Sequence, residues 1–197
     1  MVRTNSNYVE LGTLLPDAQL LEVNSGKNFN INCNSLDHRH LLIMFICAHC
    51  PFVKHIENQI TKLTKDTKEI VQTLAISSND VQTHPADSPE YLKKQAALND
   101  WSFPYLYDRD QQFAKMLKAA CTPDFYLFTN QGNSKFSLFY HGQLDDSRPS
   151  NGIDVTGSDL RNAIKTQQKE KIYKAVQKPS LGCNIKWIEG HEPKWFN

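Results

Sequence analysis

Residues 41–57 read LLIMFICAHCPFVKHIE, and this stretch decides the fold. Residues 41–46 are a continuous apolar run of strand length, which is typical of a strand covered on both faces. Pro51 is a favoured first residue of a helix, and apolar side chains recur after it at helical spacing. These apolar positions are Phe52, Val53, Ile56, Ile60 and Leu63. The stretch therefore predicts a buried strand that passes directly into an amphipathic helix, with Cys47 and Cys50 at the junction.

The downstream segments predict an α/β fold with a central mixed β-sheet flanked by helices. Residues 70–76 are rich in branched side chains, and strand, helix, strand in this order predicts a parallel unit. Residues 125–128 and 136–140 predict an antiparallel hairpin across a polar turn. A capping box at Thr156 and Asp159 predicts a last helix. Its core-facing residues are Leu160, Ala163, Ile164 and Gln167.

Two further segments surround this framework. Between its two halves, residues 88–99 and 110–120 predict helices, and residues 103–106 predict a short extended piece. We interpret all three as an insertion on the core. Residues 11–29 predict an additional β-hairpin at the N-terminus.

The chain length suggests a single domain. We expect it to span residues 1–197, with the core at about 38–170, an N-terminal extension at 1–37 and a C-terminal tail at 171–197. The tail is aperiodic, so no regular element is predicted in it. The sequence has no internal repeat that would indicate a solenoid.

Composition excludes several classes of partner. With 22 Lys and Arg against 21 Asp and Glu, the formal charge is +1, which argues against nucleic acid or an anionic membrane as partner. The first residues lack an apolar stretch, and no later run approaches the length of about 18 residues that spans a bilayer. We therefore expect a cytoplasmic protein. In a reducing compartment its five cysteines point to catalysis, metal binding or burial rather than a disulfide framework.

Cys50 is the best candidate for a reactive thiol. A cysteine at a helix N-terminus faces unsatisfied backbone N–H groups and the positive end of the helix dipole, which both favour the thiolate. Lys54, His49 and His55 are cationic groups that add to this bias. The spacing of Cys47 and Cys50 suits either a disulfide or a shared metal, and a C-x-x-C beside a parallel unit favours redox chemistry. Cys47 is otherwise a buried small hydrophobic residue.

Several stretches, read together, resemble the peroxiredoxin-like thioredoxin-family proteins of the redoxin superfamily, also called the alkyl hydroperoxide reductase and thiol-specific antioxidant superfamily. The stretches are PDAQL (16–20), MFICAHCPFVKHIE (44–57), SSND (77–80), CTPDFYLF (121–128), GQLDDSRPSN (142–151) and GCNIKW (182–187). The resemblance covers about residues 11–193. It implies a thioredoxin fold and thiol-based oxidoreductase activity without a cofactor or a resident metal.

The resemblance also assigns candidate roles. Cys50 matches the first, nucleophilic cysteine of a thioredoxin, and Val53 fills the place of the second. Cys47 is then the first choice of resolving thiol and Cys121 the second, unless Cys121 is a half-buried loop cysteine. Cys183 either resolves a sulfenic acid at Cys50 or only packs. The Pro and Thr that peroxiredoxins carry upstream of their reactive cysteine are absent here.

Two further residues belong to the predicted site. In a thioredoxin core the Thr122-Pro123 bond is cis, and its loop faces Cys50 with a backbone available to pair with an extended substrate segment. Arg148 matches the arginine that peroxiredoxins place beside the reactive thiol, and a guanidinium suits that task. The alternative for Arg148 is a solvated salt-bridge cluster with Asp145 and Asp146.

The sequence thus favours thiol-disulfide exchange or peroxide reduction, with a disulfide or a peroxide as substrate and a dithiol such as a thioredoxin as reductant. A second hypothesis is a non-catalytic redox-sensing or zinc-binding module in which Cys47, Cys50 and Cys121, with or without His49, hold the ion. A third is a chaperone or interaction protein that keeps the scaffold without turnover.

Overall fold

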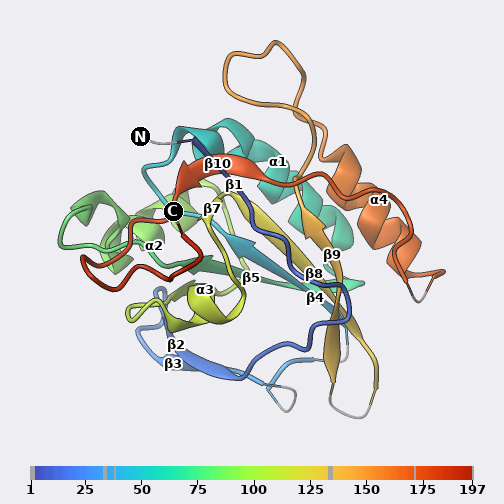
Figure 1. The fold of residues 1–197 in the computed structure, drawn as a ribbon, viewed down its shortest axis with the longest axis horizontal. Coiled ribbons are helices and arrows are strands. Elements are labelled where there is room, and N and C mark those ends of the chain that lie inside the picture. The colour runs from blue at the N-terminus through green and yellow to red at the C-terminus, as the bar shows by residue number, and fades with distance from the viewer. Residues whose placement is uncertain (1–2, 33–34, 38, 133–134, 171, 197) are drawn as a thin grey trace.

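Figure 1 shows a mixed α/β fold in which helices pack on a central sheet. It is a computed structural model, and it describes residues 3–32, 35–37, 39–132, 135–170 and 172–196. The strands are β1 (Arg3–Asn5), β2 (Ala18–Glu22), β3 (Asn28–Ile31), β4 (His40–Phe45), β5 (Val71–Ser77), β6 (Tyr105–Tyr107), β7 (Cys121–Thr122), β8 (Asp124–Asn130), β9 (Phe136–Gly142) and β10 (Leu181–Asn184). The helices are α1 (Pro51–Thr67), the short 3-10 helix η1 (Pro85–Asp87), α2 (Pro89–Leu98), α3 (Gln112–Met116) and α4 (Ser158–Gln167).

The parallel unit β4-α1-β5 is the framework of the site. β4 pairs in parallel with β5, from His40 opposite Val71 to Phe45 opposite Ile76. On its other side β4 pairs antiparallel with β8, which forms a hairpin with β9. The central sheet has the strand order β3-β2-β6-β5-β4-β8-β9. This arrangement confirms the predicted mixed sheet, and β4 lies inside it.

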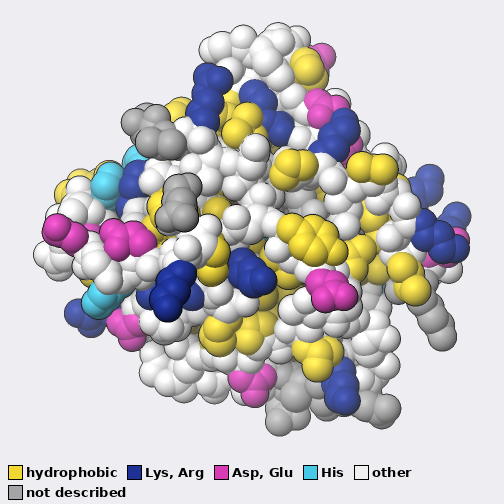
Figure 2. Space-filling view, viewed as in Figure 1, with side chains coloured by type: hydrophobic (Ala, Val, Ile, Leu, Met, Phe, Trp, Pro, Cys, Tyr) yellow, Lys and Arg dark blue, Asp and Glu magenta, His cyan; other side chains and the backbone are white. Residues whose placement is uncertain are grey.

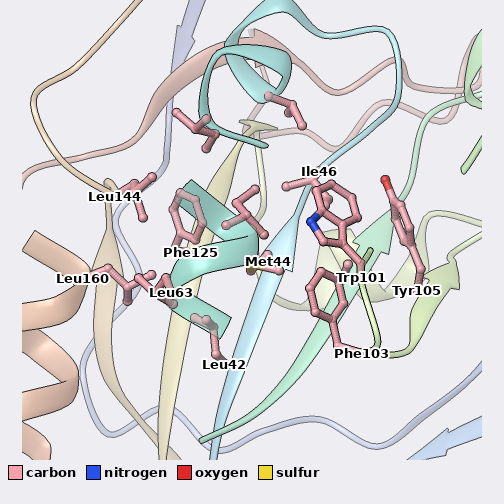
Figure 3. Close-up of a cluster of buried hydrophobic side chains, with 14 of the residues drawn as sticks. Leu42, Met44, Ile46, Leu63, Trp101, Phe103, Tyr105, Phe125, Leu144 and Leu160 are labelled. Atoms are coloured by element: carbon pink, nitrogen blue, oxygen red, sulfur yellow. The ribbon is translucent and has the colours of Figure 1, made fainter. Parts of the chain in front are cut away.

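The two faces of β4 enter different apolar cores. Leu42 and Met44 lie in the core with α1, α2 and α4, part of which Figure 3 shows. Leu41, Ile43 and Phe45 lie in the core with α3. A strand exposes alternate side chains to opposite faces, so burial on both faces explains the continuous apolar run. Nearly all of the core-facing residues predicted for the first and last helices are buried, namely Val53, Ile56, Ile60, Leu63, Leu160, Ala163, Ile164 and Gln167.

The insertion contributes a strand to the central sheet, which corrects the expectation that it lies outside the core. β6 pairs in parallel with β5 and antiparallel with β2, so it joins the predicted N-terminal hairpin β2-β3 to the sheet. Tyr105 and Leu106 are fully buried in β6. The extended piece at 103–106 was too short for its alternation to show that it pairs. The predicted helix at 110–120 is shorter than expected, since α3 ends at Met116.

A smaller sheet with the strand order β1-β10-β7 lies beside the start of α1 (Figure 1). β10 pairs antiparallel with β1 on one side and with β7 on the other. The expectation of an aperiodic tail is therefore wrong for Leu181–Asn184. A strand this short, with a glycine at its second position, carries no alternation that a sequence pattern can reveal.

α4 begins at Ser158, and its N-cap is Gly157 rather than the predicted Thr156. Gly157 has φ +70, in the left-handed region that favours glycine. The backbone N–H of Asp159 donates to the Leu144 carbonyl oxygen at 3.1 Å. The predicted capping box is therefore wrong, although the helix and its buried face are confirmed.

The molecular face in Figure 2 carries basic and acidic side chains interspersed with exposed apolar ones. Within the part of the chain that the structure describes, no helix has both the length and the apolar character that a membrane crossing requires.

Candidate functional site

Cys50 occupies the N-cap of α1, as predicted, and Pro51 is the first helical residue. β4 ends at Phe45, so a short loop carries the chain from the buried strand to the helix. Cys47 lies in this loop. The Cys47 and Cys50 side chains are hydrogen-bonded to each other, and both residues are fully buried.

The loop of Cys121 to Pro123 faces these two thiols. The Thr122-Pro123 peptide bond is cis, which confirms the prediction. In its thiol form Cys50 donates to the Thr122 carbonyl oxygen, 3.3 Å from its Sγ, and the Cys47 Sγ lies 3.4 Å from the Thr122 Oγ1. Thr122 therefore contacts both sulfurs, through its backbone and through its side chain.

Cys183 brings a further thiol into the site. It stands opposite Thr122 in the pairing of β10 with β7, and its side chain is hydrogen-bonded to Cys50. Cys183 is 2% exposed. We call Cys47, Cys50 and Cys183 the thiol cluster.

The three thiols of the cluster have pKa values shifted in different directions. Hydrogen bonds from Cys183 and then Cys47 hold the pKa of Cys50 well below its usual range, although burial opposes this shift. The hydrogen bond to Cys50, followed by burial, raises the pKa of Cys183. Burial, followed by the hydrogen bond to Cys50, raises the pKa of Cys47. The directions of these pKa shifts favour Cys50 as the member of the thiol cluster that ionises first, with Cys47 and Cys183 as donors to it.

The sequence did not single out Asp87, which organises the loop of Cys47. Its Oδ1 accepts the backbone N–H groups of Ala48 at 2.8 Å and His49 at 3.0 Å. Its Oδ2 accepts the Asn79 side-chain amide at 2.7 Å and contacts the Nδ1 of His49. Burial opposes ionisation of this carboxyl, but the hydrogen bonds from His49 and Asn79 outweigh it and lower the pKa of Asp87.

A buried polar chain supports the other side of the loop. The Gln95 side-chain amide donates to the Cys47 carbonyl oxygen at 3.2 Å, and its Oε1 accepts the hydroxyl of Tyr105 at 3.1 Å. Gln95 lies on α2, and Tyr105 lies on β6. The helix and the strand of the insertion therefore help to fix the position of Cys47.

The two histidines among the predicted cationic neighbours of Cys50 have other partners. His49 binds Asp87, and its Nδ1 lies 4.0 Å from the Cys47 Sγ rather than beside Cys50. The Nε2 of His55 lies 2.8 Å from the Ser147 Oγ. Thiol donors, more than cations, therefore stabilise the Cys50 thiolate.

Cys121 is buried with its Sγ 3.9 Å from the Pro123 carbonyl oxygen. Side chains alternate along a strand, so Cys121 and Thr122 point to opposite sides of β7, and Thr122 takes the side of the thiol cluster. Burial, and then the charge of Asp124, raises the pKa of Cys121. The hydrogen bonds that stabilise the Cys50 thiolate come from Cys183 and Cys47 rather than from Cys121.

Arg148 and Pro123 line the same small hollow, together with Phe52 at the start of α1. The guanidinium of Arg148 donates to the carbonyl oxygens of Asp145 at 2.6 Å and Ser147 at 2.7 Å, and also contacts Gln143. These contacts hold the guanidinium at the border of the hollow. They are not the carboxylate pairs that the salt-bridge alternative required.

The backbone of the Pro123 loop is already paired, which corrects the expectation that it is available to an extended substrate. Cys121 and Thr122 face Asn184 and Cys183 of β10. The tail therefore occupies the edge that we expected a substrate segment to use. Sequence patterns had no signal for this pairing, because the two strands are short and far apart in the chain.

A possible metal-ligand set differs from the predicted one. In the described part of the chain, Cys47, His49 and Asp87 offer ligand atoms that all lie within 4.8 Å of one another. Cys50 and Cys121, both members of the predicted zinc set, are not in this group. Both oxygens of Asp87 already accept hydrogen bonds from the protein.

The AhpC/TSA family model matches residues 11–136, which is more than half of the chain. This is the superfamily that the sequence motifs indicated. No curated protein matches the chain by sequence.

Two solved structures resemble the chain over almost its whole length. An uncharacterized conserved protein from Geobacillus kaustophilus is 42% identical, with a TM-score of 0.89, and the match covers 96% of this chain and 98% of that one. A hypothetical protein from Sinorhizobium meliloti is 41% identical, with a TM-score of 0.88, and the match covers 95% of this chain and 100% of that one.

More distant structures are similar in fold. A thioredoxin-like protein from Aeropyrum pernix is 17% identical, with a TM-score of 0.57 over 76% of this chain and 89% of that one. A secreted Mycobacterium tuberculosis disulfide oxidoreductase is 14% identical, with a TM-score of 0.55 over 76% of this chain and 95% of that one. These similarities confirm the thioredoxin fold.

Proposed function

The chain belongs to the AhpC/TSA family, and from this premise we propose that it is a thiol-based oxidoreductase whose attacking group is the Cys50 thiolate. One observation carries the proposal. Cys50 sits at the N-terminus of α1 and is the acceptor of two neighbouring thiols, so it alone of the thiol cluster has a lowered pKa. A thiolate is the nucleophilic form of cysteine, which makes Cys50 the reactive member.

Two reactions are open to such a thiolate. In thiol-disulfide exchange it attacks one sulfur of a disulfide, forms a mixed disulfide and releases the other sulfur as a thiolate. In peroxide reduction it attacks one peroxide oxygen and becomes a sulfenic acid, while the other oxygen leaves as water or an alcohol. A second thiol then resolves either intermediate by forming a disulfide with Cys50. A cellular dithiol such as a thioredoxin would supply the electrons that restore the thiols.

The contact between Cys47 and Cys50 supports Cys47 as a resolving thiol. While Cys50 is a thiolate, its hydrogen bond and charge raise the pKa of Cys47. Oxidation of Cys50 removes that charge, so Cys47 ionises more readily once an intermediate has formed. The His49 Nδ1, 4.0 Å from the Cys47 Sγ, already donates to the Asp87 carboxylate, so the proton that Cys47 releases passes to another base.

We assign lesser roles to the other predicted site residues. Cys121 remains a second choice of resolving thiol, and its position behind Thr122 means that the loop must rearrange before its sulfur can reach Cys50. Pro123 shapes the loop that contacts Cys50. Arg148 lines the hollow together with Pro123, where its positive charge would attract an anionic group of a substrate.

The test of this function is the substitution Cys50→Ser. A serine hydroxyl is not ionised by a helix N-terminus, so the variant should lose both peroxide consumption and disulfide reduction in the presence of a dithiol reductant. Circular dichroism should show a folded protein. Activity near that of the parent protein would reject Cys50 as the attacking group.

A zinc-binding function is the second candidate, because Cys47, His49 and Asp87 bring ligand atoms close together. Thiolate, imidazole and carboxylate groups are all zinc ligands. Elemental analysis of the protein purified without chelators decides between the two. Stoichiometric zinc that is lost in Cys47→Ser and released on oxidation would favour a redox-sensing zinc module over an enzyme.

A further inference from the structure

We propose that Cys183, which β10 delivers to the site, is the principal thiol that resolves oxidised Cys50, and that β10 occupies the place of an extended substrate strand. This proposal rests on the proposed function, because it needs Cys50 to be oxidised first. It differs from the sequence-based ranking, in which Cys47 is the first choice.

The pairing of β10 with β7 is the first support. An extended peptide that adds to a free strand edge is held by main-chain hydrogen bonds, and its alternate side chains enter the site. β10 pairs with the edge of β7 in this way, and Cys183 stands opposite Thr122. The carbonyl oxygen of Thr122 lies 3.3 Å from the Cys50 Sγ. β10 therefore presents a cysteine to Cys50 as a substrate strand would.

The close packing of Gly182 is the second support. A Cβ at this residue would lie 2.0 Å from the Thr122 carbonyl oxygen, so the two backbones touch without a side chain between them. Glycine permits this approach, and it sets the short distance between the backbone of β10 and that of the loop. The next residue, Cys183, is thereby brought into contact with Cys50.

Electrostatics favour Cys183 over Cys47 as the thiol that ionises second. The Asp87 carboxylate raises the pKa of Cys47, whereas the Lys186 ammonium lowers that of Cys183 and so opposes the effect of Cys50. Once Cys50 is oxidised, its charge no longer disfavours ionisation of either neighbour. Cys183 then retains a stabilising cation, while Cys47 retains a repelling anion and complete burial.

The reaction balances with hydrogen peroxide as oxidant. The Cys50 thiolate takes one peroxide oxygen to give a sulfenic acid, and the second oxygen leaves as hydroxide, which a proton converts to water. Cys183 then loses its proton, and its sulfur attacks the Cys50 sulfur. The disulfide between them forms as the sulfenic oxygen leaves with a proton as a second water. Two electrons have passed from the two thiols to the peroxide.

The position of β10 also restricts the oxidant. Cys47 and Cys50 are fully buried, and Cys183 is 2% exposed. While β10 is paired with β7, an extended protein segment cannot use that edge. A small oxidant is therefore reduced faster than a disulfide in an extended polypeptide, unless β10 is displaced.

The experiment treats the reduced full-length protein with one equivalent of hydrogen peroxide and maps the products by mass spectrometry over time. We expect a disulfide between Cys50 and Cys183 as the first product in the parent protein. In Cys183→Ser, a sulfenic acid at Cys50, trapped by a sulfenic-acid reagent, should persist at least about tenfold longer. Ile185→Val is a matched control that loosens the packing of the tail but keeps Cys183, and it should form the same disulfide as the parent.

The outcomes separate this inference from the proposed function. If neither hydrogen peroxide nor a small disulfide oxidises Cys50, the proposed function fails and this inference fails with it. If Cys50 is oxidised but pairs first with Cys47 or Cys121, and Cys183→Ser changes nothing, only this inference is overturned. If Cys183→Ser does not fold, the disulfide map of the parent protein decides the question by itself.

Discussion

Gly182 lies against the peptide of Thr122, so close that a Cβ on Gly182 would stand 2.0 Å from the Thr122 carbonyl oxygen. The same oxygen lies 3.3 Å from the Cys50 Sγ. A tail strand, a loop and a reactive thiol are thus in contact through one backbone carbonyl. Small displacements of β10 should therefore change the chemistry of Cys50.

Gly182→Ala tests this coupling directly. The added methyl group meets backbone atoms rather than a flexible side chain, so β10 must move away from the loop. We expect the disulfide between Cys50 and Cys183 to form several-fold more slowly after addition of peroxide. Gly190→Asn is the control within the tail, because the space around Gly190 is open and asparagine tolerates its φ of +76. Equal rates in both variants would show that the contact at Gly182 does not control the thiol.

The charge state of Cys50 gives a prediction about pH. Because donation from Cys183 and Cys47 lowers the pKa of Cys50, Cys50 stays a thiolate at every pH above that lowered value, whereas an ordinary thiol protonates below about pH 8.5. The difference in thiolate ultraviolet absorbance between the parent and Cys50→Ser should be constant from about pH 5 to about pH 8. In Cys183→Ala, which removes the donor, the pKa of Cys50 rises, so this difference should shrink toward the acidic end. A difference that titrates identically with and without Cys183 would contradict the assignment of the donor.

Cys47→Ser separates attack from resolution. Its Cys50 should still react with one equivalent of peroxide, because the helix N-terminus and Cys183 remain. If Cys47 resolves, as the sequence suggested, the variant stalls after one turnover as a sulfenic acid or mixed disulfide. If Cys183 resolves, repeated turnover with a dithiol reductant continues at a reduced rate. Steady-state peroxide consumption, compared with the single-turnover burst, distinguishes the two.

Asp87→Ala tests the support of the Cys47 loop. The backbone N–H groups of Ala48 and His49 would lose their acceptor, and each unsatisfied buried group costs about 1–3 kcal/mol. The free energy of unfolding in urea should fall by about that amount or more. Asp87→Asn retains an amide oxygen for the same donors and should lose less. An alanine variant as stable as the parent would mean that water replaces the carboxylate.

The framework of the site was predictable because its signals are local. Residues 41–46 are buried on both faces of one strand, so their apolar run is sufficient to predict the strand. The helical spacing after Pro51 then places Cys50 at a helix N-terminus, and the structure confirms that position. Both features can be read from residues that are close together in the sequence.

The parts that were missed depend on partners far away in the chain. Asp87 stands in a polar segment where an acidic residue usually faces solvent, and only the fold turns it toward Ala48 and His49. Cys183 belongs to a four-residue strand, and only the pairing of Cys183 with Thr122 places it in the site. A cysteine beside a glycine in the tail, set among the motifs of the resemblance, was the available signal.

The sheet of β1, β10 and β7 has a consequence for biosynthesis. Cys47 and Cys50 leave the ribosome long before Leu181–Asn184 is made, so the nascent chain exposes both thiols without their cover. During that interval we expect Cys50 to lack its strongest donor, Cys183, and therefore to be a less acidic thiol. The reactive form of the centre is then completed only when the last strand is inserted. The order of translation thus delays the full reactivity of Cys50 until β10 has paired with β7.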